Sequence, residues 1–231
     1  MLTDLEWEAL TLSLRISSVA VAVILIPGIC TAWVLARHEF RGKAVLDGLI
    51  HLPLVLPPVV VGYLLLMGLG RRSLLGGWLK DTFDISLPFT WQGAALAGGV
   101  MAFPLLVRAV RLSLEAVDPR LEAAAHTLGA GRLRVFLTIT LPLAVPGILT
   151  GGVLAFARSL SEFGATITFA ANIPDETRTL PLALYSLIQM PGREDAAARL
   201  CMISIGVAMI SLMASEGLAR RSRKRLGSRD A

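Results

Sequence analysis

The sequence predicts an all-α membrane protein, a bundle of about five transmembrane helices in a single domain that covers residues 1–231. Hydrophobic residues make up 55% of the chain and charged residues only 17%, and the mean hydropathy is +0.68. A soluble domain of this length cannot bury so much apolar surface. The charged residues also lie between long uncharged runs, as loop residues do in a bilayer protein.

Five uncharged runs are candidate spans. Four exceed the roughly 18 residues that mark a transmembrane helix: Ile16 to Ala36, Gly48 to Gly70, Ile85 to Val107 and Val135 to Ala157. The fifth, Leu200 to Ser215, is shorter, but Arg199 and Glu216 at its ends can reach the lipid headgroups. We therefore expect spans near 12–36, 48–70, 85–107, 137–160 and 198–218. Prolines within or near these runs predict kinks, which suit a bundle around a cavity.

The basic residues predict the orientation, because cytoplasmic segments collect Lys and Arg. If the N-terminus lies outside, most of the 22 basic residues lie inside. Those inside are Arg37, Arg41, Lys43, Arg108, Arg111, Arg120, Arg132, Arg134, Arg220, Arg221, Arg223, Lys224, Arg225 and Arg229. We expect the N-terminus outside and the C-terminus inside.

No motif in the chain indicates catalysis. The sequence has no GxxxxGK[ST] phosphate loop, Rossmann fingerprint or zinc-site spacing. Its three histidines lie in separate segments, and Cys30 and Cys201 each lie inside an apolar run. We expect no catalytic residue, no metal site, no cofactor and no nucleic-acid partner. Membrane lipid is an expected partner, because the apolar composition requires it.

Residues 118–136, after the third run, contain a short helix with both ends marked. Asp118 is a good N-cap, Pro119 is favoured at the first helical position, and Gly129 suits the left-handed residue after the last turn. About ten residues, or roughly 15 Å, cannot span a bilayer. The apolar face could lie at the lipid interface, pack on its own bundle or enter a partner's groove; it consists of Leu121, Ala124, Ala125 and Leu128.

The fourth run contains a stripe of small residues and ends in charges. Gly147, Gly151 and Ala155 allow close packing, either within the chain or between two copies. We expect the helix to continue from Ala157 to Thr168, with Arg158 and Glu162 on one face. These two ions either pair to fix helix packing or serve an anion path. In that path the guanidinium of Arg158 and the hydroxyls of Ser159, Ser161 and Thr166 contact an oxyanion. Glu162 keeps Arg158 from binding the anion too tightly to release it.

Residues 172–192 follow on the expected outer side. Pro174, Asp175 and Glu176 predict a turn, and Thr179 to Met190 predict a short apolar helix. Because this helix is too short to span the bilayer, we expect it to be re-entrant. This segment either closes the outer side of the path or merely connects two spans.

The run from Ala123 to Pro142, AAAHTLGAGRLRVFLTITLP, is similar to the coupling-loop signature of ATP-binding-cassette importer permeases. That signature begins Glu-Ala-Ala and continues with a glycine and Ile-x-Leu-Pro. The glutamate departs here, since Glu122 lies one position before the family's place for it. The resemblance implies a type I importer permease fold and a helix that docks in a cleft of an ATPase subunit. The coupling residues it implies are Glu122, Ala123, Ala124, Ala125, Leu128, Gly129, Ile139, Leu141 and Pro142.

The segment from Phe156 to Gly192, FARSLSEFGATITFAANIPDETRTLPLALYSLIQMPG, closely resembles molybdate transporter permeases, as does AARLCMISIGVAMISL further on. This implies a homodimer in the bacterial cytoplasmic (inner) membrane, two ATP-binding-cassette ATPase subunits that hydrolyse ATP, and a periplasmic molybdate-binding protein. Related sulfate permeases share the SEFGA core, so sulfate, thiosulfate or tungstate is the alternative cargo. A secondary anion transporter would need more spans and internal repeats.

Overall fold

The computed structural model describes residues 3–227, and every regular element in that range is a helix. This confirms the predicted all-α fold class. Four of these helices are long and apolar enough to cross a membrane, and a bent pair supplies a fifth candidate. Two of the four are α1 (Asp4–Arg37) and α5 (Trp91–Glu115). The third is the stretch Arg132–Leu160, which ends in α8 (Leu141–Leu160), and the fourth is Glu194–Ala214 of α11 (Glu194–Gly227).

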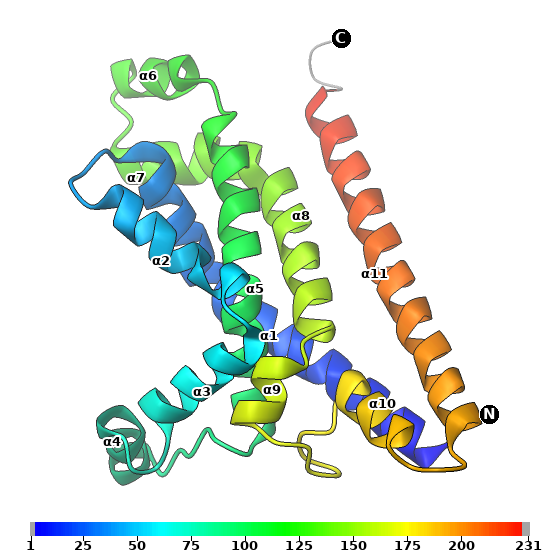
Figure 1. Ribbon diagram of the computed structural model, residues 1–231. Coiled ribbons are helices and arrows are strands. Elements are labelled where there is room, and N and C mark those ends of the chain that lie inside the picture. The colour runs from blue at the N-terminus through cyan, green and yellow to red at the C-terminus, as the bar shows by residue number, and fades with distance from the viewer. Residues whose placement is uncertain (1–2, 228–231) are drawn as a thin grey trace.

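Helix α5 is the centre of the bundle, because α1 and α8 both pack along it (Figure 1). Alanine and glycine fill the first half of α5, including Ala97, Gly98 and Gly99, and they let neighbouring helices approach closely. The larger side chains of this buried core come from α1 and α5, for example Leu35, Leu106 and Val110, whereas α8 contributes Ala144 and Ala155. Helix α11 lies against α8 and, near its start, against α10 (Leu180–Ile188).

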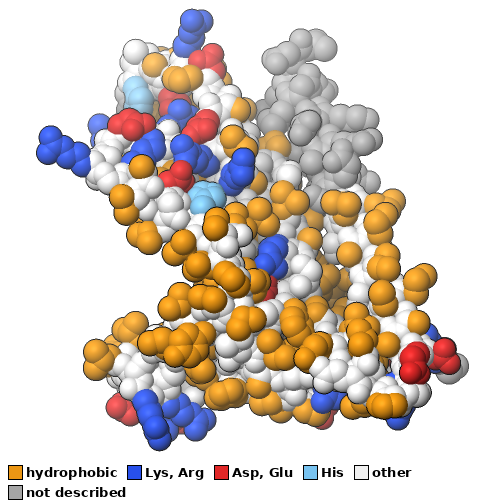
Figure 2. All heavy atoms as spheres, in the orientation of Figure 1, with side chains coloured by type: hydrophobic (Ala, Val, Ile, Leu, Met, Phe, Trp, Pro, Cys, Tyr) orange, Lys and Arg blue, Asp and Glu red, His pale blue; other side chains and the backbone are white. Residues whose placement is uncertain are grey.

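Charged side chains gather at the two ends of the molecule, and a mostly hydrophobic band separates them (Figure 2). One end carries α6 (Pro119–Thr127) and α7 (Arg132–Val135), and we call it the α6 end. The opposite end carries α4 (Leu74–Phe83), α9 (Gly164–Phe169) and α10 (Figure 1). This distribution is the one a bilayer imposes.

The second uncharged run is two helices, α2 (Lys43–Val55) and α3 (Pro58–Leu69), which are bent by 116°. A residue before proline is pushed out of the α region. Leu56 and Pro57 are accordingly extended, with ψ of 143° and 133°. Pro58 then begins α3, where its missing N–H costs nothing. Two adjacent prolines therefore turn residues 48–70 into a broken element.

Three other boundaries differ from the expected ones. Helix α5 begins at Trp91, because the Thr90 side chain caps it by accepting a hydrogen bond from Gly93 N. A π-helical turn, η1 (Phe136–Thr140), precedes α8. The expected helix from Ala157 to Thr168 was wrong, since α8 ends at Leu160 and α9 starts only at Gly164. Between them Glu162 Oε1 accepts a hydrogen bond from Ala165 N at 2.8 Å and so caps α9.

Candidate functional site

Helix α6 is a capped and exposed helix at the α6 end. The Asp118 side chain accepts a hydrogen bond from Arg120 N at 2.9 Å, Pro119 is the first residue, and Gly129 has φ of +83°. All three cap residues have their predicted roles. No residue of α6 is buried, and Leu128 just beyond it is 88% exposed. The apolar face is therefore not packed on the described bundle, which leaves the lipid interface or a partner's groove.

The other predicted coupling residues differ in exposure. Ala123 and Ala124 are exposed, whereas Ala125 is half-buried. Ile139 in η1 and Leu141 at the start of α8 are half-buried, and Pro142 is exposed. Glu122 points toward its own chain: its Oε1 accepts hydrogen bonds from Arg37 Nη2 and Thr140 Oγ1, both at 2.7 Å.

Arg158 and Glu162 form an ion pair where α8 ends. Arg158 Nη1 lies 2.7 Å from Glu162 Oε2, and the carboxylate is 2% exposed while the guanidinium side chain is 25% exposed. The second carboxylate oxygen caps α9, as described above. Glu162 therefore has both oxygens occupied and presents Arg158 at the surface of the bundle.

The hydroxyls predicted to accompany Arg158 are not all beside it. Ser161 is exposed, and its Oγ donates to Arg158 O at 3.1 Å. Ser159 is buried against α5, where a Cβ placed on Gly98 would lie 2.4 Å from its Oγ. Thr166 is also buried, in α9. Only Arg158, Ser161 and Glu162 thus gather at the turn, and the role of all five residues stays a prediction.

Two glycines position this turn by letting α9 lie against α3. A Cβ on Gly62 would lie 2.6 Å from Ala165 O, and a Cβ on Gly164 would lie 2.8 Å from Pro58 Cβ. Neither position tolerates a side chain without a shift. Helix α3, which follows the bend at Pro57 and Pro58, therefore packs closely on α9, which follows the break after α8.

The segment from Asn172 to Gly192 is held down at the opposite end. The Trp91 amide donates to Glu176 Oε1 at 3.0 Å, and the Leu180 amide donates to Ser13 Oγ at 2.7 Å. Within the segment, Asn172 Nδ2 donates to Ser186 Oγ at 2.7 Å. These bonds tie it to α5 and α1, and α10 is its short helix. Closure of a path by this segment stays a prediction.

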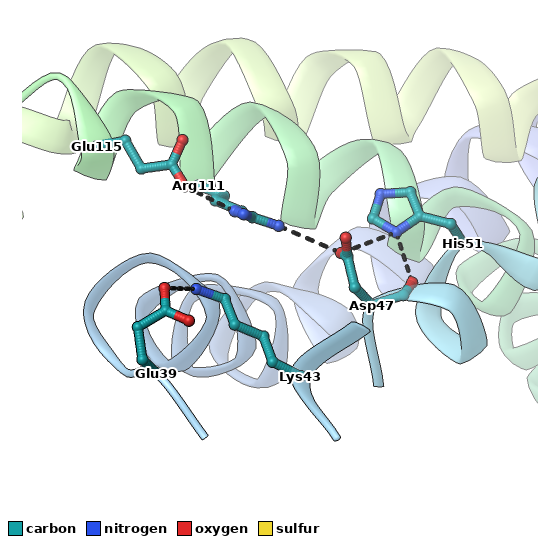
Figure 3. A network of polar contacts seen from close by, with 6 residues as sticks. All are labelled: Glu39, Lys43, Asp47, His51, Arg111 and Glu115. Carbon is teal, nitrogen blue, oxygen red and sulfur yellow. Dashed lines mark hydrogen bonds and ion pairs between the residues drawn. The ribbon is translucent and has the colours of Figure 1, made fainter. Parts of the chain in front are cut away.

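Polar contacts among six residues near α2 and α5 were not predicted (Figure 3): Asp47, His51, Arg111 and Glu115 form one group, and Glu39 pairs with Lys43 beside it. Asp47 Oδ1 lies 3.3 Å from Arg111 Nη1 and 3.3 Å from His51 Nδ1, and Arg111 Nε donates to Glu115 at 2.7 Å. The hydrogen bond from Lys43, together with its positive charge, holds the pKa of Glu39 below its usual range. The spacing of Asp47 and His51 signals a pair on one helix face, but it does not reveal Arg111.

Within residues 3–227, no group of three or more His, Cys, Asp and Glu side chains could hold a metal ion.

Comparisons with known proteins agree with this architecture. A family model described as "Binding-protein-dependent transport system inner membrane component" matches residues 28–222. The chain is 65% identical over 227 residues to the molybdenum transport system permease protein ModB of Escherichia coli K12, covering 98% of this chain and 99% of the relative. Identity to the Haemophilus influenzae protein of the same name is 55%, over 96% of this chain and 97% of that one.

More distant relatives share the fold. The sulfate transport system permease protein CysT of Escherichia coli K12 is 40% identical, over 70% of this chain and 58% of its own length. A bacterial ABC transporter that imports alginate has a TM-score of 0.75 at 17% identity, over 95% of this chain and 80% of that chain. An amino acid ABC transporter has a TM-score of 0.63 at 19% identity, over 96% and 100%.

Proposed function

We propose, from the premise that the chain belongs to the family of binding-protein-dependent transport system inner membrane components, that it is the permease subunit of an ATP-driven molybdate importer. The observation that carries this is its identity to molybdenum permeases along nearly the whole chain. It is a membrane transport subunit rather than an enzyme. ATP hydrolysis belongs to a separate partner.

The assembly is a homodimer with two ATPase subunits and a capture protein on the outer side. Under this proposal the N-terminus is outside, which places the α6 end in the cytoplasm. The basic residues of α6 and of the following α7 support that orientation: Arg120, Arg132 and Arg134. The capture protein presents the anion at the opposite end, where the segment from Asn172 to Gly192 is held against α1 and α5.

Helix α6 is the contact with the ATPase. Its caps define both ends of the helix, and Leu121 and Leu128 offer apolar surface that the described bundle leaves exposed. Closure of the ATPase dimer on ATP draws the two copies of α6 together and opens the bundle outward. Hydrolysis then returns it to the inward-facing state.

The ion pair of Arg158 and Glu162 lines the path. A guanidinium presents a planar fork that suits tetrahedral oxyanions, and the partly exposed Arg158 side chain is the more accessible member of the pair. The buried carboxylate already occupies part of that fork. A passing anion is therefore bound weakly enough to be released.

Sulfate is the second candidate cargo, because the sulfate permease CysT is also similar over most of this chain. Sulfate, molybdate and tungstate are all tetrahedral dianions, so a cationic path alone discriminates little among them. Selection among them then rests mainly with the capture protein.

The test is uptake of labelled molybdate by proteoliposomes that contain the permease, its ATPase and the capture protein. We expect ATP-dependent uptake that excess unlabelled molybdate abolishes and equal sulfate barely reduces. Stronger competition by sulfate would identify a sulfate importer, and uptake without ATP would refute an ATP-driven importer. Vesicles without the permease are the control.

A further inference from the structure

The side chain of Glu122 joins three separate elements. It projects from α6, and its Oε1 accepts one hydrogen bond from Arg37 at the end of α1 and one from Thr140 at the end of η1, both at 2.7 Å. Charge-assisted hydrogen bonds are short and about twice as strong as neutral ones. We call Glu122, Arg37 and Thr140 the Glu122 link.

The link is partly shielded from solvent, unlike an ordinary surface ion pair. Thr140 is 2% exposed, and the side chains of Arg37 and Glu122 are 19% and 21% exposed. Beside it the Trp33 ring meets the Phe136 ring edge-on, with centroids 5.6 Å apart. The end of α1 thus touches η1 through an aromatic contact and reaches α6 through an ion pair. Exposed pairs contribute little to a fixed geometry, whereas removing one partner of a shielded pair leaves an uncompensated charge. Among the described residues, Arg37 Nε is buried and has no hydrogen-bond partner, so Glu122 contacts the guanidinium through Nη2 alone.

The chain connections explain why such a link matters. Helix α6 follows α5 after three residues and leads through α7 and η1 into α8, so movement of α6 reaches α5 and α8 through the backbone. Helix α1 ends at Arg37 and has no backbone connection to α6 nearby in sequence. Helix α1 packs along α5 and α8, and the hydrogen bond from Arg37 to Glu122 adds a direct contact between α1 and α6.

The π-helical turn lies at the same junction. In η1 the amide of Leu141 donates to Phe136 O, five residues back, so the turn holds one residue more than an α-helical turn. Such turns are rare and frequently lie at functional sites. Thr140 is the last residue of the turn, so the Glu122 link attaches α6 to the point where the irregular turn becomes α8.

We infer that Glu122 is a positioning residue that transmits the movement of α6 to α1 and to the start of α8, and that it does not itself contact the ATPase. This inference rests on the proposed function, since it needs an ATPase that moves α6. The carboxylate is already occupied by Arg37 and Thr140, which leaves the exposed apolar face of α6 for the partner.

The test measures ATP hydrolysis and molybdate uptake together in proteoliposomes that contain the complete complex. For Glu122→Ala we expect the ATPase to remain bound and to hydrolyse ATP. The amount of molybdate imported per ATP should fall about tenfold, a factor typical of the coupling between two sites in one protein. Glu122→Gln keeps an acceptor oxygen for Thr140 and should lose less. The exchanged pair Arg37→Glu with Glu122→Arg restores the attraction between α6 and α1 and should recover part of the ratio.

Glu115→Ala is the matched control, because Glu115 pairs with Arg111 within α5 at the same end and touches neither α6 nor α1 in the described contacts. It should leave the ratio unchanged. An unchanged ratio in Glu122→Ala, or loss of the ATPase from both Glu122→Ala and Glu122→Gln, would overturn the inference. Failure of the wild-type complex to import molybdate would instead refute the proposed function. The wild-type sample thus tests the proposed function, and the Glu122 variants test the inference.

Discussion

Gly147 of α8 lies directly against Ser113 of α5: a Cβ built on the glycine would be 2.2 Å from the Ser113 Cβ. One turn further on, a Cβ on Gly151 would be 3.1 Å from the Ala109 Cβ. The small stripe of the fourth run therefore packs within the chain, along α5. A stripe used in this way is already covered and is not free to form the interface between two copies.

We predict that Gly147→Ala lowers the free energy of unfolding by about 1–3 kcal/mol, the usual cost of overpacking. Gly152→Ala in the same helix is the control, because a Cβ there meets nothing within 4 Å, and alanine favours the helix by up to about 1 kcal/mol. Ser113→Gly should rescue part of the loss in Gly147→Ala. Thermal unfolding in detergent measures all of these variants. Equal melting temperatures for the two glycine variants would contradict the close contact.

The end of α6 offers a second matched pair of glycines. Gly129 has φ of +83° and Gly131 has φ of −69°, and a Cβ at either meets nothing within 4 Å. Valine at position 129 therefore suffers backbone strain of about 1–2 kcal/mol without a clash, whereas valine at 131 does not. We expect Gly129→Val to release the ATPase or uncouple it, and Gly131→Val to resemble the wild type. Copurification and uptake measure this, and equal behaviour of both variants would refute the coupling role.

Local signals account for what the sequence predicted well. The caps of α6 depend on residues within one turn of each helix end, so Asp118, Pro119 and Gly129 could be read directly from the sequence. The prolines at 57 and 58 were also visible, and they predict a kink. The 116° angle was not predictable, because it depends on how closely α9 approaches Gly62.

Long-range contacts account for what the sequence missed. Arg37 and Glu122 are 85 residues apart, and no spacing rule connects them. The family resemblance placed Glu122 in a coupling role but gave no indication that its carboxylate faces its own chain. Likewise, the hydroxyls of Ser159 and Thr166 lie near Arg158 in sequence but are buried by helix packing. Ser159 lies against Gly98 of α5, and Thr166 lies in α9, beyond the break after Leu160.

The network between α2 and α5 supports a third prediction. Helix α2 has no buried residue, and Asp47 holds it to Arg111 of α5. Since both side chains are partly exposed, we expect Asp47→Asn to cost only about 0.5–1 kcal/mol and the loss to shrink at high salt. Glu39→Gln is the control, because Glu39 forms its ion pair with Lys43 and only a weaker, longer-range attraction joins it to Arg111 of α5; it should cost less than Asp47→Asn. A loss that salt does not change would show that packing, not charge, holds α2.

The ion pair of Arg158 and Glu162 gives a prediction that separates transport from stability. Arg158→Ala leaves a buried, uncompensated carboxylate, which typically costs about 3–5 kcal/mol. Reduced uptake in that variant alone would thus be ambiguous. Adding Glu162→Gln removes the charge, while the amide oxygen can still accept the hydrogen bond from Ala165 N. We expect the double variant to regain most of the stability and to keep its dimer and ATPase.

If Arg158 serves the anion path, uptake by the double variant stays at least about tenfold below the wild type. A tenfold loss corresponds to about 1.4 kcal/mol of binding free energy between the path and the anion. If the pair only fixes packing, uptake returns together with stability. Thermal unfolding, copurification of the ATPase and molybdate uptake are measured on the same preparations. Recovery of uptake in the double variant would therefore refute the path, because a neutral Glu162 cannot replace the lost guanidinium as a partner for a dianion.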